Sequence, residues 1–417
     1  MDRLRWLTAG ESHGPQLTAI LEGCPAGLAV SAADIDAQLE RRQKGYGRGE
    51  RQSIEQDRVE IVAGVRHGRT TGAPIALVVR NRDAANWGDV LAAEAPDPLA
   101  VEAPGPQAGE AGGAAGAGAG AAGAPADFGA GARSVTVPRP GHADLGGALL
   151  YDHDDIRDVI ERASARETAA RVACGAVARR LLAEVGCAIG SHVVAIGEEG
   201  SDATLSEDLL PHTDDDPVRC LDPEAAARMR AVIDAATEAG DSAGGVVEVV
   251  AFGFPPGVGS YVQADRRLSS RLAQAALSVP AMKGVEVGLG FAAARLPGSR
   301  VHDPLAWDAS RGYHRLSNHG GGVEGGISTG EPIVLRVAMK PISTLRSPLA
   351  TVELGTHQAV ESRYERADVC AVPAAGIVLE AVVALALADA LLERFGGATV
   401  ADVAEAVAAF KARCARR

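Results

Sequence analysis

The sequence predicts a mixed α+β fold. Two stretches, 31–43 and 152–186, carry apolar residues at the spacing of an amphipathic helix. Short runs rich in β-branched residues, such as "SHVVAIG" and "GGVVEVVAFGF", are typical of strands. Helices and strands do not alternate in the rhythm of βαβ units, so the pattern favours α+β over a parallel α/β sheet.

The N-terminal part is expected to hold strands and one helix. Residues 4–9 and 16–21 are predicted strands on either side of the loop "GESHG". Ser31 suits the N-cap of a helix that runs to residue 43. Residues 57–81 are predicted to form two strands around a glycine-rich turn.

The segment 103–132 differs from the rest of the chain. Of its thirty residues, 26 are Ala, Gly or Pro. Such a composition offers almost nothing to bury, so we expect a flexible surface loop inserted into the fold.

The C-terminal part is expected to begin with the long helix 152–186, capped by Asp152 or Asp154 and ended by Gly186. The β-branched runs follow it, the last being "VEVGLGFAAARL". Further elements are predicted from the same patterns: a helix at 267–278, a strand within 330–344, and helices at about 373–395 and 399–416.

Composition narrows the class of protein. The chain has 417 residues, and its net charge of −13 disfavours nucleic acid as a partner unless basic residues cluster. Its six cysteines show no CxxC pair and no metal-ligand spacing, so we expect no metal site and a reducing cytoplasm.

No membrane segment is expected. The start of the chain lacks the apolar run of a signal peptide. The most apolar stretch, 377–392, contains Glu380 and Asp389 and is too short to span a bilayer. It is therefore predicted to be a buried core helix.

Arginines gather in two motifs. "RRQKGYGRGERQ" (41–52) places Arg48 between glycines, where a ligand could approach it. The alternative is an exposed helix end with basic residues near its C-terminus. In "ERASARET" (161–168), Arg162 and Arg166 lie four residues apart, as on one helical face, although pairing with neighbouring glutamates is an equally simple explanation.

Two histidines lie between small residues, His13 in "GESHG" and His142 in "RPGHAD". Imidazole titrates near neutrality, so a histidine beside arginines could act as a general acid toward an anionic leaving group. The alternative is a surface histidine without a role.

Two further segments suit ligand binding. The glycine-rich "NHGGGVEGGISTG" (318–330) could approach a phosphate or a flat ring with its backbone, but it is neither a GxGxxG fingerprint nor a P-loop. In "RADVC", Arg366 and Asp368 lie two apart and would point the same way on an extended segment.

Taken together, these motifs resemble the chorismate synthase family. The resemblance runs from the first ten residues to about 395. It rests on eight motifs in order: GESHG, GYGRG, RPGHAD, ERASARETAARVA, MKGVE, GGVEGG, MKPIST and RADVCAVPAAG.

The resemblance implies a lyase that converts 5-enolpyruvylshikimate 3-phosphate to chorismate and phosphate by 1,4-elimination with reduced FMN. It implies that His13 protonates the leaving phosphate, that His142 protonates the reduced flavin near N1, and that Asp368 helps flavin N5 act as the base. Substrate-binding arginines follow by similarity: Arg42, Arg48, Arg51, Arg139 and Arg166.

Flavin-binding positions are likewise implied by the resemblance. Lys340, Ser343 and Thr344 suit the FMN phosphate. Pro280 departs from the family, because a polar side chain is expected there. The full set is Arg162, Ala163, Ser164, Pro280, Ala281, Gly325, Lys340, Pro341, Ile342, Ser343, Thr344 and Arg366.

The family fold implied is a single large domain, 1–417, built as a β-α-β sandwich with helices between antiparallel sheets. A cytoplasmic homotetramer is implied as well. Insertions in bifunctional relatives accompany NADPH-driven flavin reduction. The segment 103–132 is too poor in functional groups for that role, so a monofunctional enzyme supplied by an external flavin reductase is expected.

Two other functions stay open from the residues alone. A flavin or NAD(P)H oxidoreductase would need a nicotinamide site, and no dinucleotide fingerprint is present. A phosphate-ester-binding protein without activity would explain the arginines, but not two loop histidines together with Asp368.

Overall fold

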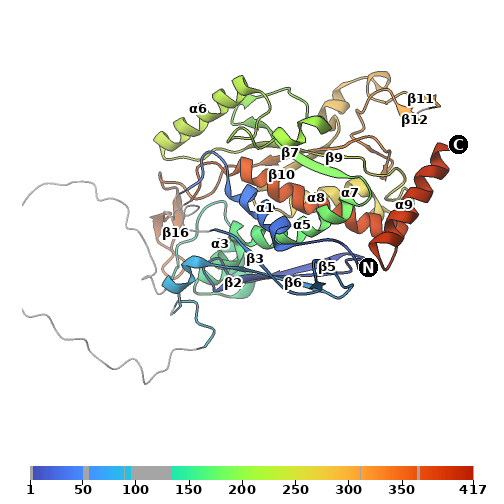
Figure 1. The fold of residues 1–417 in the computed structure, drawn as a ribbon. Coiled ribbons are helices and arrows are strands. Elements are labelled where there is room, and N and C mark those ends of the chain that lie inside the picture. Colours follow the sequence, from blue (N-terminus) through green and yellow to red (C-terminus); the bar gives the residue numbers. More distant parts are fainter. Residues whose placement is uncertain are drawn as a thin grey trace, which may run out of the picture.

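Two antiparallel sheets lie on either side of a layer of helices in the computed structural model of the chain (Figure 1). The structure describes residues 3–49, 56–88, 90–94, 134–309, 311–363 and 367–416. The predicted loop 103–132 and the two predicted ligands Arg51 and Arg366 lie outside these ranges.

The first sheet is built from the N-terminal strands, in the order β1-β2-β6-β3. Its strands are β1 (Arg5–Ala9), β2 (Gln16–Glu22), β3 (Val59–Ala63) and β6 (Ile75–Arg80). The strands predicted around "GESHG" are therefore confirmed. The two strands predicted within 57–81 are also confirmed, with the hairpin β4 (Val65–Arg66) and β5 (Arg69–Thr70) between them.

The second sheet has the order β10-β15-β9-β7-β8. Its strands are β7 (Ala188–Ile196), β8 (Glu199–Gly200), β9 (Gly245–Phe252), β10 (Met282–Val287) and β15 (Ile333–Met339). The strand predicted from "VEVGLGFAAARL" is correct only for its first residues, because the chain turns into a 3-10 helix at Gly290–Arg295.

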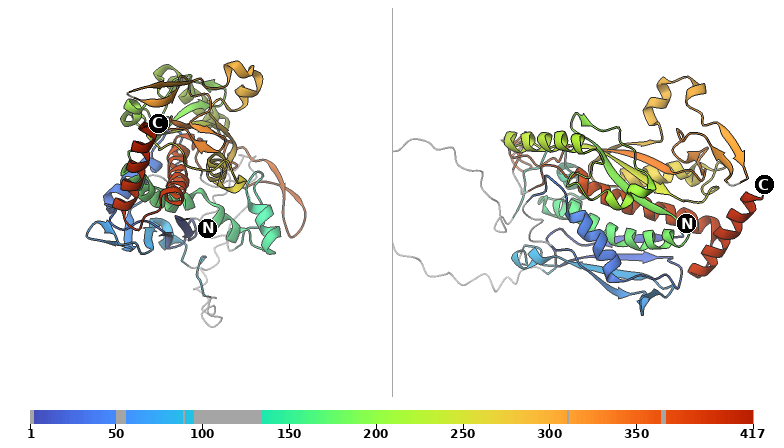
Figure 2. Two further views of the ribbon diagram at one scale, coloured as in Figure 1. Left: turned by 90° about the vertical axis from the view of Figure 1, so that its right-hand side faces the viewer. Right: turned by 45° about the horizontal axis from the view of Figure 1, so that its top comes forward.

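Four helices fill the space between the sheets, and they stay between them in all views (Figure 2). They are α1 (Ala32–Gln43), α5 (Thr168–Ala183), α7 (Leu268–Leu277) and α8 (Val372–Phe395). Helix α8 packs on α5, α7, β7 and β9, while α5 packs on β2 and β6. The expected β-α-β sandwich is confirmed.

Helix α8 is the centre of the core. Among the described residues it is the one helix long and apolar enough to cross a membrane, yet most of its residues are buried inside the protein. Burying a Leu or Val side chain contributes about 1.5–3 kcal/mol, so α8 is a major source of core stability. It packs directly on the second sheet and, through α5, is linked to the first. The prediction of a buried core helix is confirmed.

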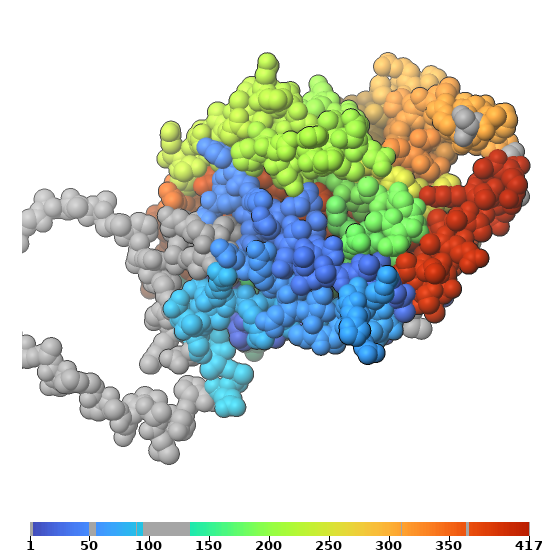
Figure 3. All heavy atoms as spheres, viewed as in Figure 1, coloured from blue at the N-terminus to red at the C-terminus, as the bar shows by residue number. Residues whose placement is uncertain are grey.

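The remaining elements lie outside the sandwich layers. Helix α6 (Pro223–Ala239) covers β7 and β8 from the outer side. Helix α9 (Val400–Ala415) and the hairpin β11 (Leu305–Asp308) and β12 (Gly312–Arg315) lie at one end of the molecule (Figure 3). Two more hairpins are β13 (Val323–Glu324) with β14 (Ile327–Ser328), and β16 (Ala350–Val352) with β17 (Ala359–Glu361).

The prediction of one long helix over 152–186 is wrong. The chain forms α3 (Asp144–Tyr151), α4 (Arg157–Ala163) and then α5, with a 3-10 turn at Ala165–Glu167. Asp152 is the C-cap of α3 instead of an N-cap, and Ile156 takes the N-cap position of α4.

The break between α4 and α5 has a local cause at Ser164. Its backbone is extended, with φ −61° and ψ 141°, and its hydroxyl accepts a hydrogen bond from the Arg166 backbone N–H. Serine competes in this way with the helical hydrogen bond. Arg162 and Arg166 consequently do not share one helical face. The expectation drawn from their spacing is wrong.

Candidate active site

A cavity of about 1550 Å³ lies where the N-terminal ends of α5 and α8 meet the loops of the first sheet. Ligand pockets for one drug-sized molecule measure about 300–1,000 Å³. This cavity therefore has room for two small molecules side by side.

The cavity is strongly basic in an acidic protein. Arginine and lysine outnumber carboxylates by eleven to five among its described lining residues, whereas the whole chain carries a net charge of −13. Such a concentration favours anionic ligands, because guanidinium groups bind phosphate and carboxylate through paired hydrogen bonds.

The "GESHG" loop is fixed at the wall of the cavity. Asn81 donates through Nδ2 to the backbone oxygens of Glu11 (3.2 Å) and Gly14 (2.7 Å). At Gly10 φ is +112°, and a Cβ there would lie 2.4 Å from the Gln16 carbonyl oxygen. The loop therefore requires glycine at this position.

His13 is held by Glu161 of α4. The Glu161 carboxylate lies 2.9 Å (Oε1) and 3.0 Å (Oε2) from His13 Nδ1 and accepts the His13 backbone N–H at 2.8 Å. Burial raises the pKa of Glu161, but hydrogen bonds and charge from His13 outweigh burial and lower it below its usual value. Glu161 is thus ionised at neutral pH and can only accept, so Nδ1 carries a proton.

His142 has a similar arrangement with Asp144, which is fully buried. Asp144 Oδ1 lies 2.5 Å from His142 Nδ1, and Oδ2 accepts from Arg139 Nε at 2.9 Å. Burial raises the pKa of Asp144, yet hydrogen bonds from His142 and Arg139 hold it well below its usual range. Each loop histidine is therefore bonded through Nδ1 to a carboxylate, and Arg139 Nη2 lies 3.1 Å from His142 Nδ1 and 3.5 Å from its Nε2.

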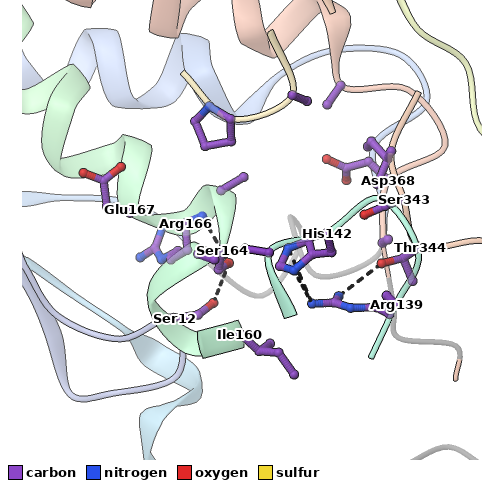
Figure 4. Close-up of a pocket in the computed structure, with 18 of the residues that line it drawn as sticks. Ser12, Arg139, His142, Ile160, Ser164, Arg166, Glu167, Ser343, Thr344 and Asp368 are labelled. Carbon is purple, nitrogen blue, oxygen red and sulfur yellow. Dashed lines mark hydrogen bonds between the residues drawn. The ribbon is translucent and has the colours of Figure 1, made fainter. Parts of the chain in front are cut away.

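The close-up of the cavity shows two walls (Figure 4). Ser12, Ser164 and Arg166 lie on one side. The Ser164 hydroxyl donates to the Ser12 hydroxyl at 3.0 Å. His142, Arg139, Thr344 and Asp368 lie on the other side, where Arg139 Nη1 donates to the Thr344 hydroxyl at 3.2 Å.

Two of the predicted arginines, Arg42 and Arg166, share the buried carboxylate of Asp57. The Asp57 oxygens lie 3.5 Å from Arg42 Nη1 and 2.5 Å from Arg166 Nη1. Burial lowers the pKa of Arg42 to about 10, with Arg166 and Arg48 adding repulsion that Asp57 offsets only in part. Three guanidiniums so close together favour an anion between them.

Arg48 and Asp368 form an ion pair in the cavity. Arg48 Nη1 lies 2.9 Å from Asp368 Oδ2, and Asp368 Oδ1 accepts the Gly49 backbone N–H at 2.7 Å. The Nε atom of Arg48 is buried and has no hydrogen-bond partner among the residues that the structure describes. A buried donor without a partner costs free energy, so a ligand that accepts from Nε would be stabilised.

Most predicted flavin-binding residues line the same cavity, and two described ones do not. The lining residues are Arg162, Ala163, Ser164, Pro280, Ala281, Lys340, Ile342, Ser343 and Thr344. Pro341 is not among the lining residues, and Gly325 lies in the turn between β13 and β14, outside the cavity of its own chain.

Lys340 suits a phosphate group. Its Nζ donates to the Gly141 carbonyl oxygen at 2.8 Å. Burial and the nearby Lys283 ammonium lower the pKa of Lys340. Two ammonium groups that repel each other, on segments that also line this cavity with the hydroxyls of Ser343 and Thr344, suit a dianionic phosphate group.

Sequence reasoning missed several residues that build the cavity. Glu161 had been considered only as a partner for neighbouring arginines, and Asp144 only as part of a motif. Trp87, which stacks on His13 with ring centroids 4.1 Å apart, had no role at all. The spacing of Asp144 two residues after His142 was a usable signal, but nothing in the sequence links Glu161 to His13.

A basic cavity with two anchored histidines is typical of enzymes that bind small anionic molecules. A family model for chorismate synthase matches residues 4–392. The chain is 51% identical over 396 residues to a chorismate synthase of Bacillus cytotoxicus, covering 94% of this chain and 95% of that protein. It is 52% identical over 397 residues to one of Geobacillus thermodenitrificans, with the same coverage.

A solved structure described as a crystal structure of chorismate synthase superposes with a TM-score of 0.74 at 39% identity, covering 99% of each chain. The chain therefore belongs to the chorismate synthase family. It is an enzyme of that type, a lyase of aromatic biosynthesis that forms chorismate at the last step of the shikimate pathway.

Proposed function

We propose that this chain converts 5-enolpyruvylshikimate 3-phosphate to chorismate and phosphate by a 1,4-elimination that requires reduced FMN. The observation that carries the proposal is the pair of histidines, His13 and His142. Each is bonded at Nδ1 to a buried carboxylate, and both line one arginine-rich cavity.

The cavity offers separate groups for the two ligands. Arg42, Arg48, Arg139 and Arg166 hold the two carboxylates and the phosphate of the substrate, and the buried Nε of Arg48 gains a partner. Arg51, from its place in the sequence, is proposed to join them.

Reduced FMN, when bound, would supply an electron transiently and recover it, which would leave no net oxidation. Lys340, Ser343 and Thr344 hold its phosphate. Beside the flavin ring we place Arg162, Ala163, Ser164, Pro280, Ala281 and Ile342. Pro341, Gly325 and Arg366 complete the set by similarity alone.

The proton steps belong to three side chains. His13 donates a proton from Nε2 to the phosphate oxygen as the C3–O bond breaks, because negative charge grows on that oxygen. His142 would present a proton to the N1 side of a bound flavin. Asp368, kept in place by Arg48 and the Gly49 N–H, assists removal of the hydrogen from C6 at the flavin N5 side.

The same proposal extends to the setting of the enzyme. We infer a monofunctional, cytoplasmic homotetramer whose FMN is reduced by a separate flavin reductase. All six cysteines are free, which is compatible with a reducing compartment.

The test is anaerobic turnover of 5-enolpyruvylshikimate 3-phosphate, followed as phosphate and chorismate, with FMN reduced by dithionite. We expect equal amounts of both products with reduced FMN and none with oxidised FMN. NADPH in place of dithionite should give no turnover, and turnover with NADPH would instead indicate a bifunctional enzyme.

A further inference from the structure

Glu161 and Trp87 surround His13 in a way that the family resemblance did not lead us to expect. The last turn of α4 contacts the "GESHG" loop at three points. The Glu161 backbone carbonyl accepts the Ser12 N–H at 3.0 Å, and the Glu161 carboxylate accepts both the backbone N–H and Nδ1–H of His13. Figure 4 shows this side of the cavity through Ser12 and the neighbouring Ile160.

The Glu161 carboxylate is almost completely shielded. Its side chain is 1% exposed, against 18% for His13. Arg157, one turn earlier on α4, places Nη1 3.7 Å from Glu161 Oε1 and so provides a countercharge. A buried carboxylate with these donors fixes the proton on Nδ1, and proton loss from the imidazolium then occurs at Nε2.

Trp87 restricts the plane of the imidazole ring. The two rings stack at 4.1 Å with an angle of 23°. The Arg157 guanidinium lies 5.1 Å from the centroid of the Trp87 ring, and the Trp87 indole N–H donates to Asp83 Oδ2 at 3.2 Å. The indole is therefore held in place and leaves His13 little freedom to rotate.

We propose that Glu161 and Trp87 are positioning residues for proton transfer from His13, Glu161 by keeping a proton on Nδ1 and Trp87 by fixing the ring plane. This inference rests on the proposed acid role of His13. After the imidazolium passes its Nε2 proton to the phosphate oxygen, the neutral ring keeps the Nδ1 proton, which Glu161 already binds. No rearrangement of the ring is needed before or after the step.

A double-mutant cycle tests whether Glu161 acts through His13. Single-turnover phosphate release with pre-reduced FMN is measured for wild type, Glu161→Gln, His13→Ala and the double variant. Removing a partner that orients a catalytic group costs on the order of 10- to 100-fold in activity. We expect that loss from Glu161→Gln in the wild-type background, and less than about twofold in the His13→Ala background.

Trp87→Ala provides the second arm, because Trp87 is only partly buried and its removal spares the core. We expect the same pattern, with slower release in the wild-type background and no further loss beside His13→Ala. Equal losses in both backgrounds, for either residue, would overturn the positioning role of that residue. A His13→Ala variant with wild-type release would instead overturn the acid role itself.

A spectroscopic measurement distinguishes a positioning role of Glu161 from a general loss of structure in the variant. The measurement is NMR of protein whose histidines carry nitrogen-15. In the wild type, the neutral His13 ring should show the Nδ1–H tautomer, and in Glu161→Gln it should show a mixture of both tautomers. The matched control is Glu248→Gln, which removes a buried carboxylate 3.1 Å from His192 Nε2 and away from the cavity. Control activity should stay unchanged, and an unaltered His13 tautomer in Glu161→Gln would contradict the inference.

Discussion

Asp144→Asn tests how strongly one buried carboxylate organises the second histidine. Asp144 is 0% exposed and accepts from the Arg139 backbone N–H (3.0 Å), Arg139 Nε (2.9 Å) and His142 Nδ1. The amide of asparagine keeps one acceptor but loses the charge. It therefore leaves the buried guanidinium of Arg139 without a counterion on this side.

The size of the effect follows from these contacts. Breaking a buried ion pair by removing one partner costs about 3–5 kcal/mol. Since the asparagine oxygen can still accept one hydrogen bond, we expect a loss near the lower limit, about 3 kcal/mol in the free energy of unfolding. Urea unfolding measures it, and Asp208→Asn, at an exposed position, is the control.

The stability that Asp144 contributes depends on pH in a definite direction. The pKa of Asp144 is lower in the folded chain than in the unfolded chain, so its contribution is complete above the unfolded value of about 3.9. It is lost progressively as the pH falls below that value. The difference in free energy of unfolding between wild type and Asp144→Asn should therefore shrink as the pH falls. A difference below about 1 kcal/mol at pH 7, or one that grows toward low pH, would refute this reasoning.

Three further changes have defined outcomes. Arg48→Ala should weaken substrate binding by about 1.5–3 kcal/mol and FMN binding much less, as measured by titration of each ligand; equal weakening would place Arg48 elsewhere. Glu380→Gln removes the carboxylate that accepts from Arg41, Arg179 and Arg219 in the core, so urea unfolding should show a loss of about 3–5 kcal/mol, and a loss under 1 kcal/mol would contradict this. Replacing 103–132 by a short Gly-Ser linker should leave activity and Tm nearly unchanged, because this composition offers few side chains for contacts; a large loss of either would show that the segment is needed.

The fold was predictable wherever one local pattern decided it. The strands next to "GESHG", the helix capped by Ser31 and the apolar helix α8 all follow from periodicity and capping residues. The long helix over 152–186 failed because its pattern continues through Ser164. The Ser164 hydroxyl caps the following turn by accepting the Arg166 backbone N–H, and it also bonds to Ser12, a residue 152 positions away.

The residue types of the site were predictable from the sequence. The contacts between its residues were not. Glycine-flanked histidines and arginines could be recognised in the sequence, since few structural roles suit them. The pairing of Arg48 with Asp368 and of His13 with Glu161 joins segments far apart in the chain. No periodicity records such contacts, so they required the folded structure.

The proton donated by His13 is the central claim of this account. Single-turnover phosphate release from 5-enolpyruvylshikimate 3-phosphate with pre-reduced FMN, compared between wild type and His13→Gln, tests it most directly. Glutamine keeps similar size and hydrogen bonding but cannot supply the proton. We predict normal FMN binding and an unchanged fold, with release slowed by roughly 10²–10⁴-fold, the range for loss of a general acid. Release by His13→Gln at close to the wild-type rate would contradict the claim and leave "GESHG" with a purely structural role.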